Sequence, residues 1–422
     1  MPMPQHNPTT AGPLPALVLT DRYPSPDRLY ANMFVHQRVL GYAARGQAVR
    51  VFVCREGLDA GEYSFEGVDV AQGSPEDLRA RLLQGGYGCL LVHFLGDCIM
   101  SAIDGAGVKV PILVWMHGYE AMSWLRRWFF FDLGGLLRRG SGRAPAQPVA
   151  GNAPGGSAAA QSSHKSLGYY ARKFAAQVFH LRRLRDFLRR HREQLDVVFV
   201  SQWLRGIVAK DVGLPQGLRA HVIHNPIDTD AFAYVPKRAE QRYKLLSIRS
   251  FSNRKYANDI TVKAIEILSQ KPYFDQLDIL VAGDGPLFER VTGPLKRFPN
   301  VQVRRQFFTQ EQMAALYREY GVFLCPTRMD TQGVSMGEAM ASGMVCVSSD
   351  NSAIPEFLPE TAGFRTRGPR GVAAAVDYLL KNDERYAILS ENAAAAVRVK
   401  CAAQDILKQE LELIAGAQRR NT

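Results

Sequence analysis

The chain has 422 residues, and at about 150 residues per domain this length allows two or three domains with sizeable cores. Hydrophobic residues make up 46% and charged residues 22% of the composition, which excludes a wholly disordered, collagen-like or disulfide-scaffold protein. The net charge of +12 arises in residues 126–192, which hold 14 basic and 2 acidic side chains, while the rest of the chain balances. A uniformly basic nucleic-acid binder would not show this distribution, so we expect no nucleic-acid partner.

Several signals are missing from the sequence. The six cysteines form no C-x-x-C pair and no zinc-binding spacing, so we expect reduced thiols and no metal site of that kind. No run reaches the roughly 18 apolar residues that a membrane-spanning helix needs. Residues 1–15 lack the pattern of a signal peptide and are expected to be disordered. These observations predict a cytoplasmic protein.

In the first half of the chain, short apolar runs alternate with helical patterns. The predicted strands cover residues 16–20, 49–54, 89–94, 111–118, 196–201 and 221–225. Helical patterns lie around residues 34–40 and after Ser74, which caps a helix with Pro75 in its first turn. Short apolar strands separated by helices predict a parallel sheet covered on both faces.

The second half repeats this alternation. The predicted strands cover residues 244–248, 278–285, 301–307, 321–327 and 345–349, and the predicted helices include 259–268 and 310–320. Thr309 and Gln312 form a capping box at the start of the second of these helices.

We therefore predict an α/β protein with two Rossmann-like doubly wound domains facing each other across a cleft. The domains cover residues 16–228 and 243–400, with a linker at 229–242. The C-terminal helix at 401–422 is expected to pack back on the first domain.

The basic segment 126–192 interrupts the first domain as an insertion. Gly, Ala, Ser and Pro fill 19 of the 24 positions at 140–163, which predicts a disordered loop. An aromatic cluster precedes the loop: Trp124, Trp128, Phe129, Phe130 and Phe131. Apolar residues at three- or four-residue steps follow it and predict a basic amphipathic helix: Tyr170, Phe174, Val178, Leu181, Leu184 and Leu188. We expect the segment to attach to an anionic membrane surface; the alternative is that the apolar stripe packs on the first domain.

The strongest chemical signal lies near residue 330. Asp330 and Glu338 are separated by seven residues, with Gly333 between them and a helix expected to begin near Val334. Glycine lets a ligand approach the backbone, helix-start amides can bind phosphate, and carboxylates accept hydrogen bonds from sugar hydroxyls. The alternative is an ordinary loop and helix start, where acidic residues suit the helix dipole.

Two other segments follow strands of the second half. Arg249 and Lys255 come after the strand at 244–248, where fixed cations suit a diphosphate, although solvated loop charges are the alternative. Gly283, Asp284 and Gly285 resemble a phosphate-binding turn, which an ordinary strand-to-helix turn explains equally well.

In the first half, His117 ends the strand at 111–118 and precedes Gly118. Side chains at the carboxyl end of such a strand are exposed to the cleft, where a histidine can hydrogen-bond a sugar hydroxyl.

In this order, the segments resemble the donor half of glycosyltransferase family 4, the retaining GT-B enzymes. The resemblance rests on Arg249 with Lys255, the turn at 283–285, the carboxylate-x7-Glu segment and residues 349–356. Residues 117–120 and 222–232 resemble first-domain and interdomain signatures of the same family. The likeness covers most of residues 16–415 apart from the insertion.

The resemblance implies transfer of a hexose or related sugar, with retention, from a nucleotide diphosphate sugar to a glycan or lipid-linked acceptor. It points to cell-surface polysaccharide or lipopolysaccharide synthesis, without a metal or other cofactor. By the resemblance, Arg249 and Lys255 would neutralise the leaving diphosphate, and His117 would face the donor sugar. Its remaining donor contacts would be the turn Gly283, Asp284 and Gly285, the base contact Phe307 or Phe308, the amides of Gly333 and Val334, the ribose contact Glu338 and the sugar contact Asp330.

The sequence departs from this family pattern at three places. Asp330 stands where the family usually has Glu, so the contact with the donor sugar is shortened by one methylene. The paired glycines common after the first strand are missing from residues 22–34, which leaves the acceptor-side loop unassigned. Gln306 replaces a frequent Gly just before the segment that contacts the base.

Two other functions are compatible with the same fold: a sugar-nucleotide epimerase and a non-catalytic sugar-nucleotide binder. A dinucleotide oxidoreductase is disfavoured because no first strand is followed by G-x-G-x-x-G with an acidic residue about twenty positions later.

Overall fold

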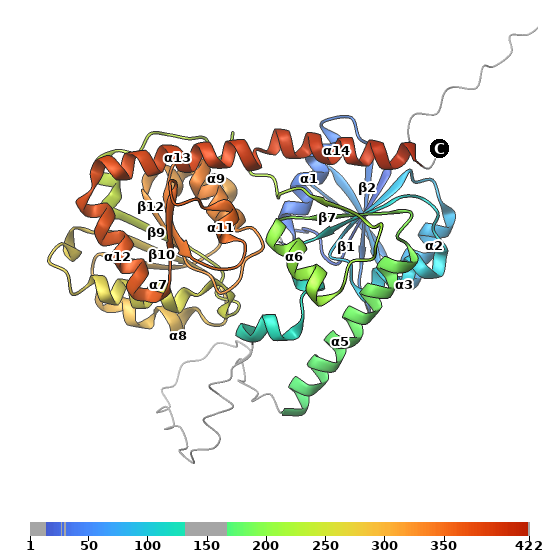
Figure 1. Ribbon diagram of the computed structural model, residues 1–422, viewed down its shortest axis with the longest axis horizontal. Helices are drawn as coiled ribbons and strands as arrows, with labels where there is room; N and C mark the ends of the chain where they lie inside the picture. Colours follow the sequence, from blue (N-terminus) through green and yellow to red (C-terminus); the bar gives the residue numbers. More distant parts are fainter. Residues whose placement is uncertain (1–13, 27, 29–30, 131–166, 421–422) are drawn as a thin grey trace, which may run out of the picture.

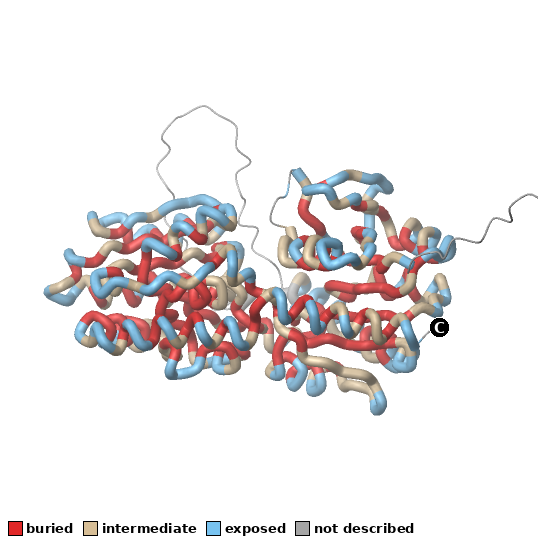
Figure 2. The backbone as a smooth tube through the Cα atoms, turned by 90° about the horizontal axis from the view of Figure 1, so that it is seen from above, coloured by how far each residue is buried: buried red, intermediate tan, exposed pale blue. Residues whose placement is uncertain are grey.

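The computed structural model describes residues 14–26, 28, 31–130 and 167–420. These residues form two α/β domains that lie side by side in Figure 1. Two C-terminal helices, α13 (Asp383–Cys401) and α14 (Ala403–Arg419), run one after the other along the second and then the first domain. Figure 2 shows buried residues running through the interior of both domains.

The first domain is built on an eight-stranded sheet with the order β3-β4-β2-β1-β5-β6-β7-β8. Its strands are β1 (Ala16–Thr20), β2 (Val49–Cys54), β3 (Gly61–Phe65), β4 (Val68–Gly73), β5 (Cys89–His93), β6 (Ile112–Met116), β7 (Leu195–Phe199) and β8 (Arg219–Val222). Its helices are α1 (Met33–Ala43), α2 (Pro75–Gln84), α3 (Asp97–Ala106), α5 (Leu167–Arg190) and α6 (Gln202–Asp211), with short 3-10 turns η1 (Tyr119–Ala121) and η2 (Trp124–Phe130).

Both faces of the first sheet are covered. Along β1, Leu17 and Leu19 belong to one buried cluster and Val18 to another, because successive side chains of a strand point to opposite faces. The predicted cap of α2 is confirmed: the Ser74 hydroxyl accepts from the Asp77 amide, and Pro75 lies in the first turn.

The second domain is built on a six-stranded parallel sheet with the order β11-β10-β9-β12-β13-β14. Its strands are β9 (Lys244–Ile248), β10 (Asp278–Gly283), β11 (Val301–Arg305), β12 (Val322–Cys325), β13 (Val345–Ser349) and β14 (Gly363–Thr366). Its other helices are α7 (Asn258–Leu268), α8 (Phe288–Thr292), α9 (Gln310–Glu319), α10 (Val334–Ala341), α11 (Ile354–Phe357) and α12 (Gly368–Lys381), with the 3-10 turn η5 (Arg254–Tyr256). The capping box at Thr309 and Gln312 is confirmed.

Two parallel-sheet Rossmann-like domains confirm the predicted fold class. The prediction of a purely parallel first sheet was wrong, because β3 pairs with β4 in antiparallel orientation. Glu66 and Gly67 connect these strands with positive φ angles of 46° and 78°, the backbone of a tight hairpin turn. The last strand of this sheet was also misplaced: β8 ends at Val222, because the chain then leaves the sheet towards the second domain. Strand β14 was not predicted.

A buried polar network fixes α14 on the first domain. The Glu410 carboxylate lies 3.0 Å from Arg38 Nε, 2.7 Å from the Tyr42 hydroxyl and 2.9 Å from Trp115 Nε1. Arg38 and Glu410 are both fully buried. Removing either charge would leave the other one buried and unpaired, which typically costs about 3–5 kcal/mol.

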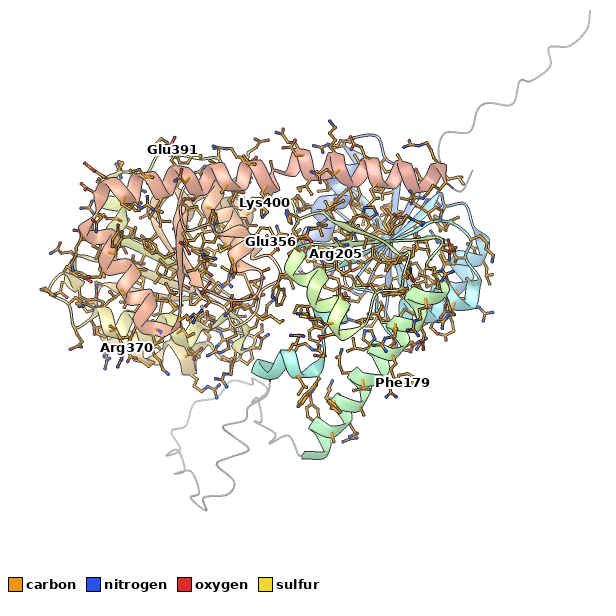
Figure 3. The ribbon with its side chains drawn as sticks, in the orientation of Figure 1. Phe179, Arg205, Glu356, Arg370, Glu391 and Lys400 are labelled. Atoms are coloured by element: carbon orange, nitrogen blue, oxygen red, sulfur yellow. The ribbon has the colours of Figure 1, made fainter. Side chains whose placement is uncertain are left out.

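Helix α5 of the basic segment is divided between two environments. Leu184, Phe187 and Leu188 are buried against the first domain, whereas Phe174 and Phe179 are 45% and 65% exposed. In Figures 1 and 3 the N-terminal part of α5 projects away from the domain, and Figure 3 labels Phe179 near the middle of the helix. The predicted loop at 140–163 and Phe131 lie outside the described residues, as do the side chains of Trp128, Phe129, Phe130 and Tyr170. None of the described helices is both long and apolar enough to cross a membrane.

Candidate functional site

The second sheet reverses its strand order between β9 and β12, which are neighbours although β10 and β11 separate them in sequence. In open parallel sheets, ligands bind outside the carboxyl ends of the strands at this reversal. Arg249 directly follows β9, and Asp330 lies in the loop after β12. The topology therefore places two of the predicted residues at the edge where ligands bind in this class of fold.

Arg249 is held in a fixed position at this edge. Its Nη1 donates to the Ser335 hydroxyl at 2.7 Å, and its Nη2 lies 3.7 Å from Asp330 Oδ2. The guanidinium also stacks over the Tyr256 ring, 4.6 Å from its centre. The side chain is nearly buried, and its Nε has no hydrogen-bond partner among the described residues. The Arg249 cation is thus held in place by protein contacts, and its Nε–H makes no hydrogen bond to the described residues.

Lys255 provides a second cation beside the first. It lies in the η5 turn, and its Nζ is 5.0 Å from the centre of the same Tyr256 ring. Burial disfavours the charged amine, but the carboxylate of Asp330 and the hydroxyl of Tyr256 together outweigh this effect and raise the pKa of Lys255 above its ordinary value. Lys255 is therefore charged at neutral pH, and the site carries two cations and one carboxylate.

Asp330 organises its own loop. Its Oδ1 accepts a hydrogen bond from the Gly333 amide at 3.0 Å, and its backbone amide donates to the Ser352 hydroxyl at 2.9 Å. Gly333 has a φ of 81° immediately before α10, a conformation that favours glycine. The Asp330 carboxylate therefore shapes the start of α10 in addition to facing Arg249.

Arg328, which the sequence did not single out, joins the loops that carry Lys255 and Asp330. Its guanidinium forms two hydrogen bonds with the Asp259 carboxylate, at 2.8 and 2.7 Å, and a third with the Arg254 carbonyl at 2.7 Å. Its backbone amide donates to the Lys255 carbonyl at 2.8 Å. Because these bonds span both loops, Arg328 fixes the distance between them.

Glu338 lies one helical turn into α10. Burial of its carboxyl group raises its pKa to about 8. None of the described residues hydrogen-bonds to this carboxylate, whereas the serine of the same helix, Ser335, is bonded to Arg249. Glu338 is thus an acceptor that a ligand can occupy, and its role as the ribose contact stays a prediction.

The turn at 283–285 is dictated by packing. A Cβ on Gly283 would lie 1.8 Å from the Arg249 carbonyl oxygen, and a Cβ on Gly285 would lie 2.3 Å from the Phe251 backbone. Asp284 pairs with Arg305 at 2.7 Å. The two glycines therefore let β10 approach the Arg249 segment, which supports the alternative of a strand-to-helix turn; contact with the donor stays a prediction.

The two candidates for a base contact differ in exposure. Phe308 is buried in the core of the second domain, whereas Phe307 is 54% exposed. Among the two, Phe307 is the side chain that a ligand can reach.

His117 approaches this site from the first domain. The backbone amide of His117 donates to Glu120 Oε1 at 2.5 Å, and Gly118 follows with a φ of 125°. A Cβ on Gly118 would lie 2.5 Å from the methyl group of Thr331, the neighbour of Asp330. The turn after His117 therefore lies directly against the Asp330 loop, and only a glycine permits this approach.

Other contacts hold the two domains together near the site. The backbone amide of Asn225 donates to Gln332 Oε1 at 2.5 Å, and Gln332 Nε2 donates to the backbone carbonyl of Asn225 at 2.9 Å. The carboxylate of Glu356, labelled in Figure 3 near the junction of the domains, accepts from the backbone amides of Gln202 and Trp203 at the start of α6. These contacts fix the first domain against the Asp330 loop.

Sequence reasoning missed Arg328, Ser335 and His93, the last of which contacts His117. Ser335 could have been found, because it lies one residue after the predicted helix start. Arg328 and His93 lie at the ends of predicted strands, as Arg249 and His117 do, but their contacts gave no signal because the partners come from distant parts of the chain. Among the residues that the structure describes, no group of three or more His, Cys, Asp or Glu side chains is arranged to hold a metal ion.

Residues 242–382 match the family model described as Glycosyl transferases group 1. The matched stretch contains Arg249, Lys255, Asp330 and Glu338, so these four residues lie within the part of the chain that is similar to this family. No curated protein matches the chain in sequence.

Solved structures resemble the whole two-domain arrangement. Sucrose-phosphate synthase from Thermosynechococcus elongatus has a TM-score of 0.64 at 14% identity, covering 95% of this chain and 98% of that one. HepE from Anabaena in complex with UDP-glucose has a TM-score of 0.64 at 12% identity, covering 95% and 99%. A glycosyltransferase from Rickettsia africae has a TM-score of 0.59 at 10% identity, covering 96% and 98%. The fold is that of GT-B glycosyltransferases.

Proposed function

We propose that the protein is a retaining glycosyltransferase that moves a hexose or related sugar from a nucleoside diphosphate sugar to a glycan or lipid-linked acceptor. The observation that carries this proposal is the pair of fixed cations, Arg249 and Lys255, at the strand reversal of the group 1 domain. The UDP and UDP-glucose in the HepE complexes support a donor of this class.

The geometry suits departure of a diphosphate. When the bond between the anomeric carbon and the diphosphate oxygen breaks, its electron pair leaves with the diphosphate. The acceptor oxygen then bonds to the carbon, and its hydroxyl proton passes to the departing diphosphate. Negative charge on the diphosphate then grows, and pre-positioned cations stabilise it more in the transition state than in the ground state. Glu338 would hold the ribose, Asp330 the donor sugar, and the Gly333 and Val334 amides would contact the donor.

The test is a transfer assay with nucleoside diphosphate sugars and candidate glycan or lipid-linked acceptors. We expect nucleotide release to depend on the acceptor, and NMR of the product to show the anomeric configuration of the donor. An epimerase would interconvert the donor sugar without an acceptor, and a non-catalytic binder would release no nucleotide. Inversion at the anomeric carbon would contradict the retaining mechanism.

We further propose that the enzyme works on the inner face of the cell membrane, attached through the basic segment 126–192. Phe179, which Figure 3 labels on α5, is exposed, and Phe174 remains 45% exposed although its ring packs edge-on against Trp124. Arg182 and Arg189 are also exposed, whereas Arg183 and Arg190 are paired with carboxylates of α3. Each basic residue near an anionic surface contributes about 1 kcal/mol before screening, so a few exposed ones suffice for reversible attachment. A lipid-linked acceptor would make this placement useful for cell-surface polysaccharide or lipopolysaccharide synthesis.

A further inference from the structure

A second histidine lies beside His117. His93, the last residue of β5, is fully buried, and its Nδ1 is 3.0 Å from His117 Nε2. The two rings are stacked, with centres 5.3 Å apart and planes inclined by 20°. On its other side His93 stacks on the buried Trp115 at 4.9 Å. The His93 ring therefore has a defined position, and its contact with His117 is a hydrogen bond between two imidazoles.

The ring of His117 is enclosed on other sides by aromatic side chains. Phe34 packs against it edge-on with ring centres 4.8 Å apart, and Phe94 packs against it at 4.7 Å. Phe94 has a φ of 59°, an uncommon conformation for a residue other than glycine. These contacts fix the plane of the His117 ring, so the remaining variable is which of its nitrogens carries the hydrogen.

Both imidazoles are neutral. Burial, and then the positive charge of Arg38, lower the pKa of His117 well below its ordinary value, and burial and His117 do the same for His93. Each ring therefore has one N–H donor and one acceptor nitrogen. In the hydrogen bond between them, one ring donates and the other accepts.

The surroundings of His93 determine which of the two imidazoles donates this hydrogen bond. Its Nε2 is buried and has no hydrogen-bond partner among the described residues. A hydrogen on this nitrogen would be a buried donor without an acceptor, which is more costly than an unused lone pair. The hydrogen therefore belongs on His93 Nδ1, which then donates to His117 Nε2.

We propose that His93 is a positioning residue that fixes the tautomer of His117, so that His117 carries its hydrogen on Nδ1 and presents a donor to the site. No described residue hydrogen-bonds to His117 Nδ1. One part of this inference rests on the proposed function: the Nδ1–H of His117 is taken to donate to an oxygen of the donor sugar. A histidine held in this form acts as a hydrogen-bond donor and not as a base at Nδ1.

The test is long-range proton–nitrogen correlation NMR of the ¹⁵N-histidine-labelled protein, with the His117 signals identified by their loss in His117→Gln. We expect His117 as the Nδ1–H tautomer in the wild type and as the other tautomer or a mixture in His93→Leu. His93→Asn should restore the Nδ1–H form, because its amide nitrogen can take the place of the imidazole Nδ1. Finding the Nε2–H tautomer in the wild type, or no change in a folded His93→Leu, would overturn the proposal.

Activity provides the second readout. Partners that orient a functional histidine typically contribute on the order of tenfold, so His93→Leu should lower kcat of transfer by about that factor and His93→Asn by much less. His191→Leu is the matched control, because His191 pairs with Asp104 on the α3–α5 contact. It should leave both the His117 tautomer and kcat unchanged. The NMR measurement needs no sugar nucleotide, so a wild type without transferase activity would count against the proposed function and leave the tautomer result standing.

Discussion

The guanidinium of Arg249 lies 3.7 Å from the carboxylate of Asp330, and both residues are buried. One residue follows β9 and the other follows β12, so the pair forms where the strand order of the second sheet reverses. Lys255 lies close enough to Asp330 for its pKa to be raised by that carboxylate. A diphosphate bound at this edge would therefore meet cations that are already fixed.

Arg249→Ala and Lys255→Ala should each lower kcat strongly and leave the domain folded. Losing a contact that strengthens in the transition state costs on the order of 2–4 kcal/mol, or roughly 30- to 1,000-fold in rate. Steady-state kinetics and circular dichroism check this expectation. Lys263→Ala is the control, because Lys263 is an exposed cation of α7. Near-normal activity in the double variant would show that the diphosphate binds elsewhere.

Glu338→Ala should raise the dissociation constant of the donor more than Asp330→Asn does, because ribose contacts persist from the ground state to the transition state. Asparagine can still accept the hydrogen bond from the Gly333 amide, so Asp330→Asn probes the sugar contact without releasing the loop. This variant should change the preference among donor sugars. Isothermal titration calorimetry with several donors measures this preference. An equal loss of affinity for every donor sugar would argue against the role of Asp330.

Donor binding should strengthen as the pH rises towards 8. The pKa of Glu338 is about 8 in the free protein, so at lower pH the carboxyl group is protonated and must ionise before it can accept from both ribose hydroxyls. The ionisation penalty corresponds to about tenfold in affinity for each pH unit below that pKa. The dependence should disappear in Glu338→Gln. A wild-type affinity that is flat between about pH 6 and pH 8 would contradict a carboxylate contact with the ribose.

Arg328→Lys should weaken catalysis without touching the donor. Lysine cannot form the two-point contact with Asp259, so the loops carrying Lys255 and Asp330 lose their common anchor. We expect about a tenfold drop in kcat/KM. Asp259→Asn should have a similar effect, and the double variant should be little worse than either single one. If the losses of kcat/KM in the two single variants add up in the double variant, Arg328 and Asp259 act separately.

Attachment to vesicles should depend on the exposed basic residues of α5. Arg182→Gln with Arg189→Gln should reduce sedimentation with phosphatidylglycerol-rich liposomes at low salt, and high salt should release the wild type. Arg183→Gln with Arg190→Gln is the matched pair with the same charge change, and it should have less effect because these arginines are bound to Asp97 and Asp104. If sedimentation depends neither on the charge of the lipids nor on any of these substitutions, the basic segment has a structural role and does not attach the protein to membranes.

The fold could largely be predicted from local patterns, because buried parallel strands are short apolar runs and helix starts carry caps such as Ser74 and Thr309. The hairpin of β3 and β4 was not predicted, because Gly61–Phe65 is mostly exposed and polar and the only signal lies in the turn at Glu66 and Gly67. The division of α5 into a buried and an exposed part was also not predicted, since periodicity identifies an amphipathic helix but not how much of its apolar stripe is covered.

The candidate site was predictable where side chains follow strands, as with Arg249 and Asp330, because topology brings the carboxyl ends of parallel strands together. It was not predictable where function depends on pairs distant in sequence. The contacts of Arg328 with Asp259 and of His93 with His117 join different elements, and no spacing within one segment encodes them.

Under the proposed function, Arg249 and Lys255 bind the diphosphate of a sugar nucleotide. The most direct measurement is a thermal-shift screen of nucleoside diphosphate sugars against the wild type and the Arg249→Ala/Lys255→Ala variant. We predict that a suitable donor at 100 times its dissociation constant stabilises the wild type by about 2.7 kcal/mol and the double variant far less. A screen in which no sugar nucleotide stabilises the wild type, or in which the double variant is stabilised equally, would contradict the account.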